Sequence, residues 1–244
     1  MPKYLLPKHI AYTRGLADHI KFNFSDSTAH ALTYEQLCAF SVDELNSILL
    51  SYSPVQGDVL LRQLIINFHQ GLNCHRQTLE ADNAVTFCGA QEALSAVYQA
   101  LLDADDEIIV LTPSYPSLVT MAKTMGVVVK EIALCADNHW QVHIEDFSRL
   151  MTEKTRLIVL NSPHNPTGSI IDSALAEQVL QLAEQYQCYL LSDDVSQASN
   201  YHDLALAHRY LDYSKSIVVG VIVGVGVIVG IIIGVSVITS RSIV

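Results

Sequence analysis

Residues 84–111, AVTFCGAQEALSAVYQALLDADDEIIVL, decide the fold class. The stretch begins with a short β-rich run at 84–88, continues with apolar residues at helical spacing at 90–102, and ends in a second apolar run at 107–111. Two short apolar strands that flank an amphipathic helix are typical of sheets whose parallel strands are connected by helices. The stretch therefore predicts an α/β fold with a mostly parallel sheet.

The same alternation extends in both directions from this stretch. Asp58 can cap a helix in which Leu60, Leu61, Leu64, Ile65 and Phe68 form one apolar face. Further segments follow the same two patterns: strands are expected at 127–133, 156–160 and 188–191, with another beginning at 216–219, and helices at 34–50, 115–125 and 173–187. We expect helices on both faces of the sheet.

Composition excludes some classes of function. The 244 residues include 14 Lys and Arg against 25 Asp and Glu, a net charge of −11, which disfavours binding to the phosphate backbone of nucleic acids. The five cysteines form no CxxC pair, and the first 22 residues have no apolar core typical of a secretory signal. We therefore expect reduced thiols and a cytoplasmic location.

Ligands of parallel sheets bind at the carboxyl ends of the strands, so the loops after the predicted strands are the ones to inspect. Gly89 precedes a helix start, where free N–H groups favour a phosphate, although a plain turn explains it too. Tyr115 can stack on a flat ligand or cover the sheet edge. Asn165, between two prolines, can present its amide to a ligand oxygen. Asp193 ends a buried strand and is either a helix cap or the partner of a cationic group.

Together these loops supply a phosphate site, an aromatic plate, an amide and a buried carboxylate. This set suits pyridoxal 5′-phosphate, in which a carboxylate keeps the pyridine nitrogen protonated so that the ring accepts electrons.

Residues 1–219 resemble the class I/II pyridoxal-phosphate-dependent aminotransferases of fold type I. Asn165-Pro-Thr-Gly168 matches their signature, and Asp193 follows at the family's spacing. The resemblance implies that Asn165 contacts the ring hydroxyl, that Asp193 holds the ring nitrogen, and that Tyr115 stacks on the ring. It further places two residues on the phosphate loop and one tyrosine at the phosphate of the partner subunit in a homodimer: Ala90, Gln91 and Tyr52.

Two positions depart from the family pattern. Ser196 stands where the family usually has a tyrosine that contacts the ring hydroxyl. The lysine that forms the Schiff base is expected near Gly224, where no lysine stands. Lys215 is the one nearby candidate: its surroundings fit in part, but it comes early and precedes the apolar run, so a solvated loop lysine is the alternative. The family's downstream arginine for the cofactor phosphate and its C-terminal domain are also expected to be missing.

Residues 217–238 carry no charge and are almost entirely Val, Ile and Gly. Their length and hydropathy fit a transmembrane helix, while their β-branched side chains fit strands. Because the resemblance stops near Gly220, we expect a low-complexity remainder produced by a frameshift, a recombination event or an error, with a membrane anchor as the second account.

The sequence thus predicts an N-terminal segment at 1–50, an incomplete cofactor-binding large domain at 51–219 and an apolar tail at 220–244. The expected activity is amino-group transfer from an amino acid to a 2-oxo acid, impaired because the lysine is absent or misplaced. The alternatives are a non-catalytic or membrane-associated fragment and a lyase or cyclase of the same fold.

Overall fold

The computed structural model describes Tyr12, residues 19–22, Thr33, residues 35–36, 51–72, 79–197, 215–224 and 227–234. The chain divides into two compact units, and the fold below belongs to the unit of residues 52–222 and 228–244, apart from the ends of two strands at 223–227. The helix expected at 34–50 and the N-terminal segment 1–50 lie almost wholly outside the described residues.

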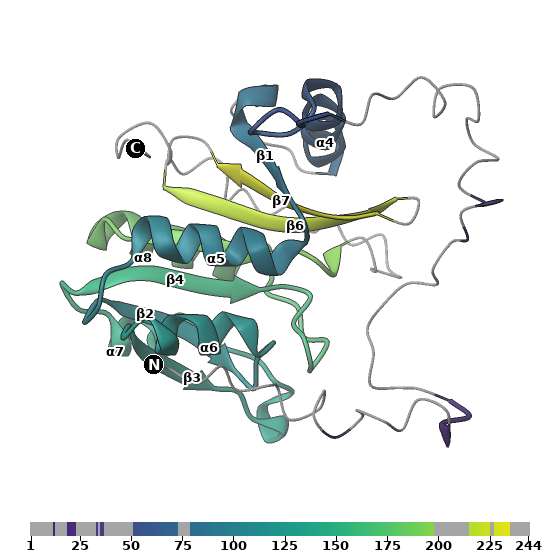
Figure 1. The fold of residues 1–244 in the computed structure, drawn as a ribbon. Helices are drawn as coiled ribbons and strands as arrows, with labels where there is room; N and C mark the ends of the chain where they lie inside the picture. The colour runs from purple at the N-terminus through teal and green to yellow at the C-terminus, as the bar shows by residue number, and fades with distance from the viewer. Residues whose placement is uncertain are drawn as a thin grey trace. The chain divides into compact units, whose positions relative to one another are not determined.

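A seven-stranded sheet forms the centre of the described unit (Figure 1). Its strands are β1 (Ala84–Phe87), β2 (Glu107–Thr112), β3 (Val128–Ala133), β4 (Thr155–Asn161), β5 (Tyr189–Asp193), β6 (Ser216–Gly224) and β7 (Val227–Gly234). The spatial order is β1-β7-β6-β5-β4-β2-β3. Every strand expected from the sequence is present, and β7 was not foreseen.

Most of the strands are parallel, as predicted. Strands β2 to β6 pair in parallel with one another, and β7 pairs antiparallel with β1. Two residues separate β6 from β7, and so short a connection joins only antiparallel strands. Strand β1 therefore runs in the same direction as β6, and the carboxyl ends of β1, β2, β4 and β5 lie toward one edge.

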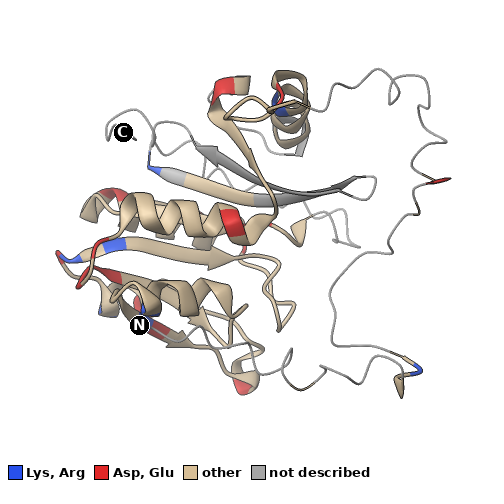
Figure 2. Ribbon diagram, viewed as in Figure 1, with Lys and Arg blue, Asp and Glu red and all other residues tan. Residues whose placement is uncertain are grey.

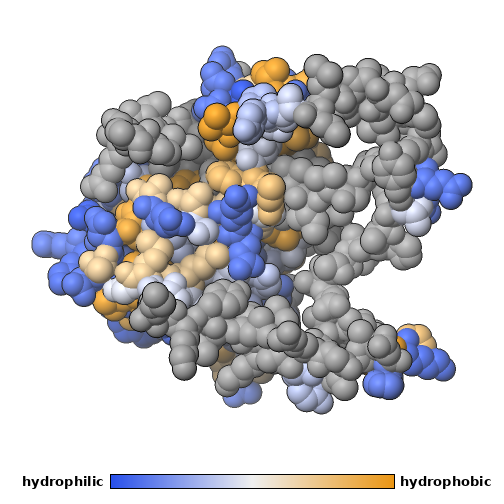
Figure 3. All heavy atoms as spheres, in the orientation of Figure 1, coloured by the Kyte–Doolittle hydropathy of each residue, from blue (hydrophilic) through white to orange (hydrophobic). Residues whose placement is uncertain are grey.

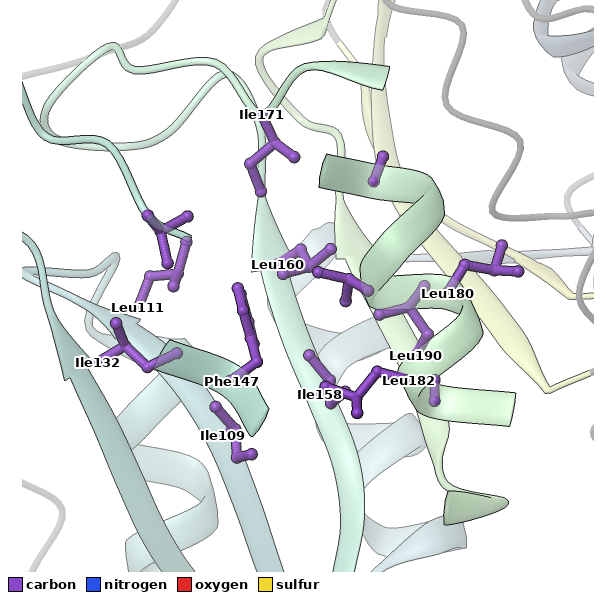
Figure 4. Close-up of a cluster of buried hydrophobic side chains, with 14 of the residues drawn as sticks. Ile109, Leu111, Ile132, Phe147, Ile158, Leu160, Ile171, Leu180, Leu182 and Leu190 are labelled. Carbon is purple, nitrogen blue, oxygen red and sulfur yellow. The ribbon is translucent and has the colours of Figure 1, made fainter. Parts of the chain in front are cut away.

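Helices cover both faces of the sheet, as predicted (Figure 1). They are α4 (Val59–Leu72), α5 (Ala90–Leu101), α6 (Ser117–Thr124), α7 (Ile144–Leu150) and α8 (Ser173–Tyr186), with 3-10 turns η2 (Ala81–Asn83) and η3 (Ala136–Asn138). One core lies beneath α7 and α8, where Phe147 of α7 packs between Ile109, Ile158 and Leu160 (Figure 4). The other lies beneath α5 and α6 and includes Tyr98. These two cores alternate along β2, β4 and β5, since successive side chains point to opposite faces. A third cluster beneath α4 includes Ile65, Ile66 and Val218.

Helix α4 begins as predicted but buries a different face. The Asp58 carboxylate accepts a hydrogen bond from the Leu61 amide at 3.0 Å, which caps the helix. Ile65 and Ile66 are fully buried, whereas three residues of the predicted apolar face are exposed: Leu60, Leu64 and Phe68. The predicted apolar face therefore lies mainly on the exposed side of α4, because the helix carries apolar residues on more than one side and periodicity alone does not choose which of them is buried.

The apolar tail forms strands where the structure describes it. Residues 216–224 and 227–234 belong to β6 and β7, so a transmembrane helix across 217–238 is wrong for these residues. None of the helices in the described ranges is long and apolar enough to cross a membrane. Val and Ile favour strands because their branched side chains pack well on a pleated surface. The domain boundary expected at residue 220 falls within β6 and stays a prediction.

The loop before α4 requires a glycine at position 57. Gly57 has φ of +96°, and a Cβ there would lie 1.9 Å from Thr86 Oγ1 of β1. We expect Gly57→Ala to destabilise the protein by about 2–5 kcal/mol through backbone strain and overpacking. Gly168→Ala is the control, because Gly168 has φ of +74° but open space around it, and we expect a loss of only about 1–2 kcal/mol. Urea denaturation measures both, and equal losses would contradict the role of the Thr86 contact.

Candidate functional site

The site is built at the common carboxyl edge of the parallel strands. Asn161 ends β4 and lies opposite Asp193, which ends β5 and lies opposite Val219 of β6. Two residues earlier on β4 and β5, Val159 and Leu191 belong to the core beneath α5 and α6. Strand alternation therefore places the side chains of Asn161 and Asp193 on the face that α5 and α6 cover.

Asp193 is a buried carboxylate with little local compensation. Its side chain accepts one hydrogen bond, from the Val195 amide to Oδ1 at 3.1 Å, and the residue is 4% exposed. Burial raises the pKa of Asp193 to about 6, although the Val195 hydrogen bond lowers it. Within the described ranges, no lysine, arginine or histidine forms an ion pair with it. Such a group is suited to a cationic partner, which the described residues do not supply.

The charge of Asp193 affects the pKa of a tyrosine on α5. Burial, followed by the nearby charge of Asp193, raises the pKa of Tyr98, whose hydroxyl donates to the Leu118 carbonyl at 2.9 Å. Tyr98 lies in the core beneath α5 and α6, which agrees with the orientation that strand alternation gives Asp193.

A second buried carboxylate follows immediately but belongs to the other face. Asp194 Oδ1 accepts a hydrogen bond from Ser192 Oγ at 2.5 Å, and Ser192 alternates with Leu191 on β5. Burial raises the pKa of Asp194 to about 7, the Ser192 hydrogen bond lowers it, and the charge of Asp193 raises it. The sequence analysis did not select Asp194. Like Asp193, it is a carboxyl group buried at the end of an apolar strand, which is rare in proteins.

The start of α5 offers free donors. Gly89 is the N-cap, with φ of +102°, and its own amide bonds to the Phe87 carbonyl. The amides of Ala90 and Gln91 have no acceptor among the described residues. The Glu92 side chain does not occupy them, since it accepts instead from the Cys88 amide at 2.6 Å. Two free N–H groups at a helix N-terminus form an anion site.

The two remaining predicted loops also border this edge. Tyr115 precedes α6, is half-buried, and packs on the same core as Ala90 of α5. Asn165 is half-buried, and its side-chain amide makes no hydrogen bond to the described residues, which leaves it available to a ligand. His164 supports this loop from within: its Nδ1 lies 2.8 Å from Thr167 Oγ1, and burial lowers the pKa of its imidazole.

Lys215 lies at the opposite end of the sheet. Its Nζ donates to the Gln187 carbonyl at 2.8 Å and lies 5.7 Å from the centre of the Tyr189 ring, at the start of β5. Asp193 ends the same strand. Figure 2 likewise shows basic residues near the starts of β4 and β6. The placement agrees with the solvated-loop alternative and does not support Lys215 as the Schiff-base residue. Gly224 is the last residue of β6.

The other two predicted residues have simple surroundings. Tyr52 is fully exposed, so it does not reach the phosphate loop of its own chain. Ser196 is half-buried in the turn after Asp193, and the residues after Gln197 lie outside the described part until Lys215.

The donor set fits pyridoxal phosphate at three points. A buried carboxylate with a raised pKa suits a protonated ring nitrogen, a free amide suits the ring hydroxyl, and two free N–H groups suit the phosphate. The described residues provide no amino group at this edge, so the fit covers binding of the cofactor and not its covalent attachment.

An open, mostly parallel sheet with these groups at its carboxyl edge is typical of α/β proteins that bind a phosphate-bearing cofactor. The family model for aminotransferase class I and II matches residues 23–227, and the chain belongs to this family. Its members use pyridoxal 5′-phosphate.

Curated relatives and solved structures agree with this assignment. The chain is 34% identical to arginine–pyruvate transaminase of Pseudomonas aeruginosa over 64% of its length, and 34% identical to methionine aminotransferase of Escherichia coli over 66%. The match spans only 39% and 42% of those proteins, about two fifths of their length. A solved methionine aminotransferase of Escherichia coli superimposes with a TM-score of 0.78 at 26% identity, covering 96% of this chain and 64% of that structure.

Proposed function

We propose that this chain binds pyridoxal 5′-phosphate and derives from an aminotransferase that moves an amino group from an amino acid to a 2-oxo acid. The observation that carries the proposal is the buried Asp193 carboxylate, which has a raised pKa and lacks an ion-pair partner among the described residues. A cytoplasmic location is part of the same proposal, supported by free thiols at Cys88, Cys135 and Cys188.

Each residue at the edge has one task in this proposal. When bound, the cofactor supplies a ring that withdraws electrons from the substrate's α-carbon. Asp193 holds a proton on the ring nitrogen, because a buried anion strongly favours the protonated form of a cationic partner. The side-chain amide of Asn165 donates to the ring hydroxyl, and Tyr115 covers one side of the ring. The backbone N–H groups of Ala90 and Gln91 bind the phosphate.

The step that this chain does not support is proton transfer at the substrate. In the family, a lysine amine at the pocket acts as the general base. Lys215 instead donates a hydrogen bond to the Gln187 carbonyl, at the amino end of β5. We therefore propose a chain that binds the cofactor non-covalently and transaminates poorly. A non-catalytic binding protein is the second candidate, favoured by the same placement of Lys215.

Calorimetric titration with 4′-deoxypyridoxine 5′-phosphate tests the proposal. This probe carries the ring nitrogen, the hydroxyl and the phosphate but has no aldehyde, so it forms no adducts with surface lysines. We expect saturable binding of one probe per chain, and competition by inorganic phosphate. The absence of saturable binding would overturn the proposed function.

We also propose a homodimer in which Tyr52 serves the partner subunit's phosphate site. Two features support it: the full exposure of Tyr52, and an exposed apolar face on α4 formed by Val59, Leu60, Leu64 and Phe68. Part of this apolar surface is visible at α4 in Figure 3. Exposed apolar groups at such density are typical of protein interfaces.

A charge at the centre of this face tests the dimer. We expect Leu64→Glu to raise the dimer dissociation constant about thirtyfold or more, because the carboxylate would be desolvated between subunits. Gln181→Glu adds the same charge at an exposed position on α8, outside this face, and should leave the constant unchanged. Sedimentation velocity measures both, and equal effects would contradict the assignment of this face.

A further inference from the structure

A single buried side chain connects the two loops assigned to the cofactor ring. Asn161 is 4% exposed at the end of β4. Its Nδ2 donates to the backbone carbonyl of Asp193 at 2.9 Å, and its Oδ1 accepts from the backbone N–H of Asn165 at 2.7 Å. Both ends of the side-chain amide are therefore used, one toward each loop.

The chemistry of the two partners fixes the orientation of the Asn161 amide. A backbone carbonyl requires a donor and a backbone N–H requires an acceptor, so exchanging the nitrogen and oxygen would break both bonds. The Ser162 amide adds a second donor to the Asp193 carbonyl at 3.3 Å, which holds this peptide group in place. Aspartate or leucine at position 161 could not satisfy both partners.

We propose that Asn161 is a positioning residue that sets the spacing between Asp193 and Asn165. The inference rests on the proposed function, in which these residues contact the ring nitrogen and the ring hydroxyl. Those two ligand atoms are separated by the rigid geometry of one aromatic ring. The protein groups must therefore keep one spacing, and loss of the bridge weakens a ligand that engages both groups more than a ligand that engages one.

Ser162 provides a matched control for loss of a buried hydrogen bond in the same loop. It is 1% exposed, and its Oγ accepts from the Ile171 amide at 3.1 Å. Ser162→Ala removes that bond and leaves both bonds of Asn161 intact. An effect that depends only on loosening the loop would be shared by the two positions.

The experiment compares two probes on four proteins. Calorimetry measures affinity for 4′-deoxypyridoxine 5′-phosphate and for its 3-deoxy analogue, which lacks the ring hydroxyl. The proteins are wild type, Asn161→Ala, Asn161→Asp and Ser162→Ala, and circular dichroism establishes that each is folded. Asn161→Asp keeps the acceptor for Asn165 and loses the donor to Asp193, so it remains informative where the alanine variant unfolds.

We expect both Asn161 variants to bind the hydroxylated probe about tenfold more weakly and the 3-deoxy analogue as wild type does, with Ser162→Ala unchanged toward both. Equal losses for the two probes, or an equal loss in Ser162→Ala, would overturn the inference and leave the proposed function standing. A wild-type chain that fails to bind the hydroxylated probe would overturn the proposed function and this inference with it.

Discussion

Replacing Asp193 with asparagine is expected to stabilise the unliganded protein above pH 7 and to weaken binding of 4′-deoxypyridoxine 5′-phosphate about a hundredfold. The gain in stability arises because the carboxyl has a pKa of about 6 when folded and 3.8 otherwise. Ionising it in the folded state therefore costs ~3 kcal/mol. Asparagine keeps an oxygen for the Val195 amide, so the local hydrogen bond survives. The loss of affinity arises because the ring nitrogen loses its anionic partner.

The sign of the pH dependence follows from which state binds more protons. Between pH 3.8 and about 6 the folded Asp193 is protonated while the unfolded one is ionised, so wild-type stability falls as the pH rises through this window. The penalty is complete above about pH 6. Urea denaturation at a series of pH values should show wild type and Asp193→Asn converging below pH 4, diverging between pH 4 and about 6, and separated by a constant difference at higher pH. Equal stability at pH 8 would contradict the buried, uncompensated carboxylate.

Asp194→Asn is the matched control. Its carboxyl is also buried with a raised pKa, and asparagine can still accept from Ser192 Oγ. We expect a similar gain in stability at pH 8 with unchanged affinity for the probe, because Asp194 faces away from the site. If both variants lost the probe equally, the loss would reflect general rearrangement of this strand end.

The second large effect concerns catalysis. The chain is expected to transaminate at least ~10²–10⁴-fold more slowly than an enzyme with a positioned lysine, since general acid–base catalysis contributes that much. Borohydride reduction in the presence of pyridoxal 5′-phosphate, followed by peptide mass spectrometry, should give scattered, substoichiometric adducts. Lys215→Ala should leave that pattern unchanged, as should Lys123→Ala at a surface ion pair with Glu131. A single stoichiometric adduct on Lys215, with amino-group transfer before reduction, would contradict this account.

Much of the fold could be predicted because its strands are continuous apolar runs. The segment 107–111 and the segment 156–160 are buried on both faces, so hydrophobicity alone marks them. Helix α7 was missed because it is only seven residues long and buries mainly Phe147. The exposure of the apolar face of α4 could not be predicted, because apolar residues on a helix do not reveal which of them pack against the core.

The candidate site was predicted in part for a related reason. Gly89, Asn165 and Asp193 follow strands, and parallel topology brings strand ends together. Asn161 was missed because its role depends on two hydrogen bonds to backbone groups: the carbonyl of Asp193, on the neighbouring strand, and the N–H of Asn165, in the following loop. A polar residue at the last position of an otherwise apolar strand was the one available signal.

In the proposed function, Asp193 keeps a proton on the ring nitrogen of a bound cofactor. The most direct test of this claim is the ¹⁵N chemical shift of the ring nitrogen in 4′-deoxypyridoxine 5′-phosphate labelled at that atom and bound to the wild-type chain, recorded above the pKa of the free ring. The wild-type complex is expected to show a shift typical of the protonated ring. Any complex that Asp193→Asn still forms at high probe concentration is expected to show a shift typical of the deprotonated ring. A deprotonated ring nitrogen in the wild-type complex would contradict the claim.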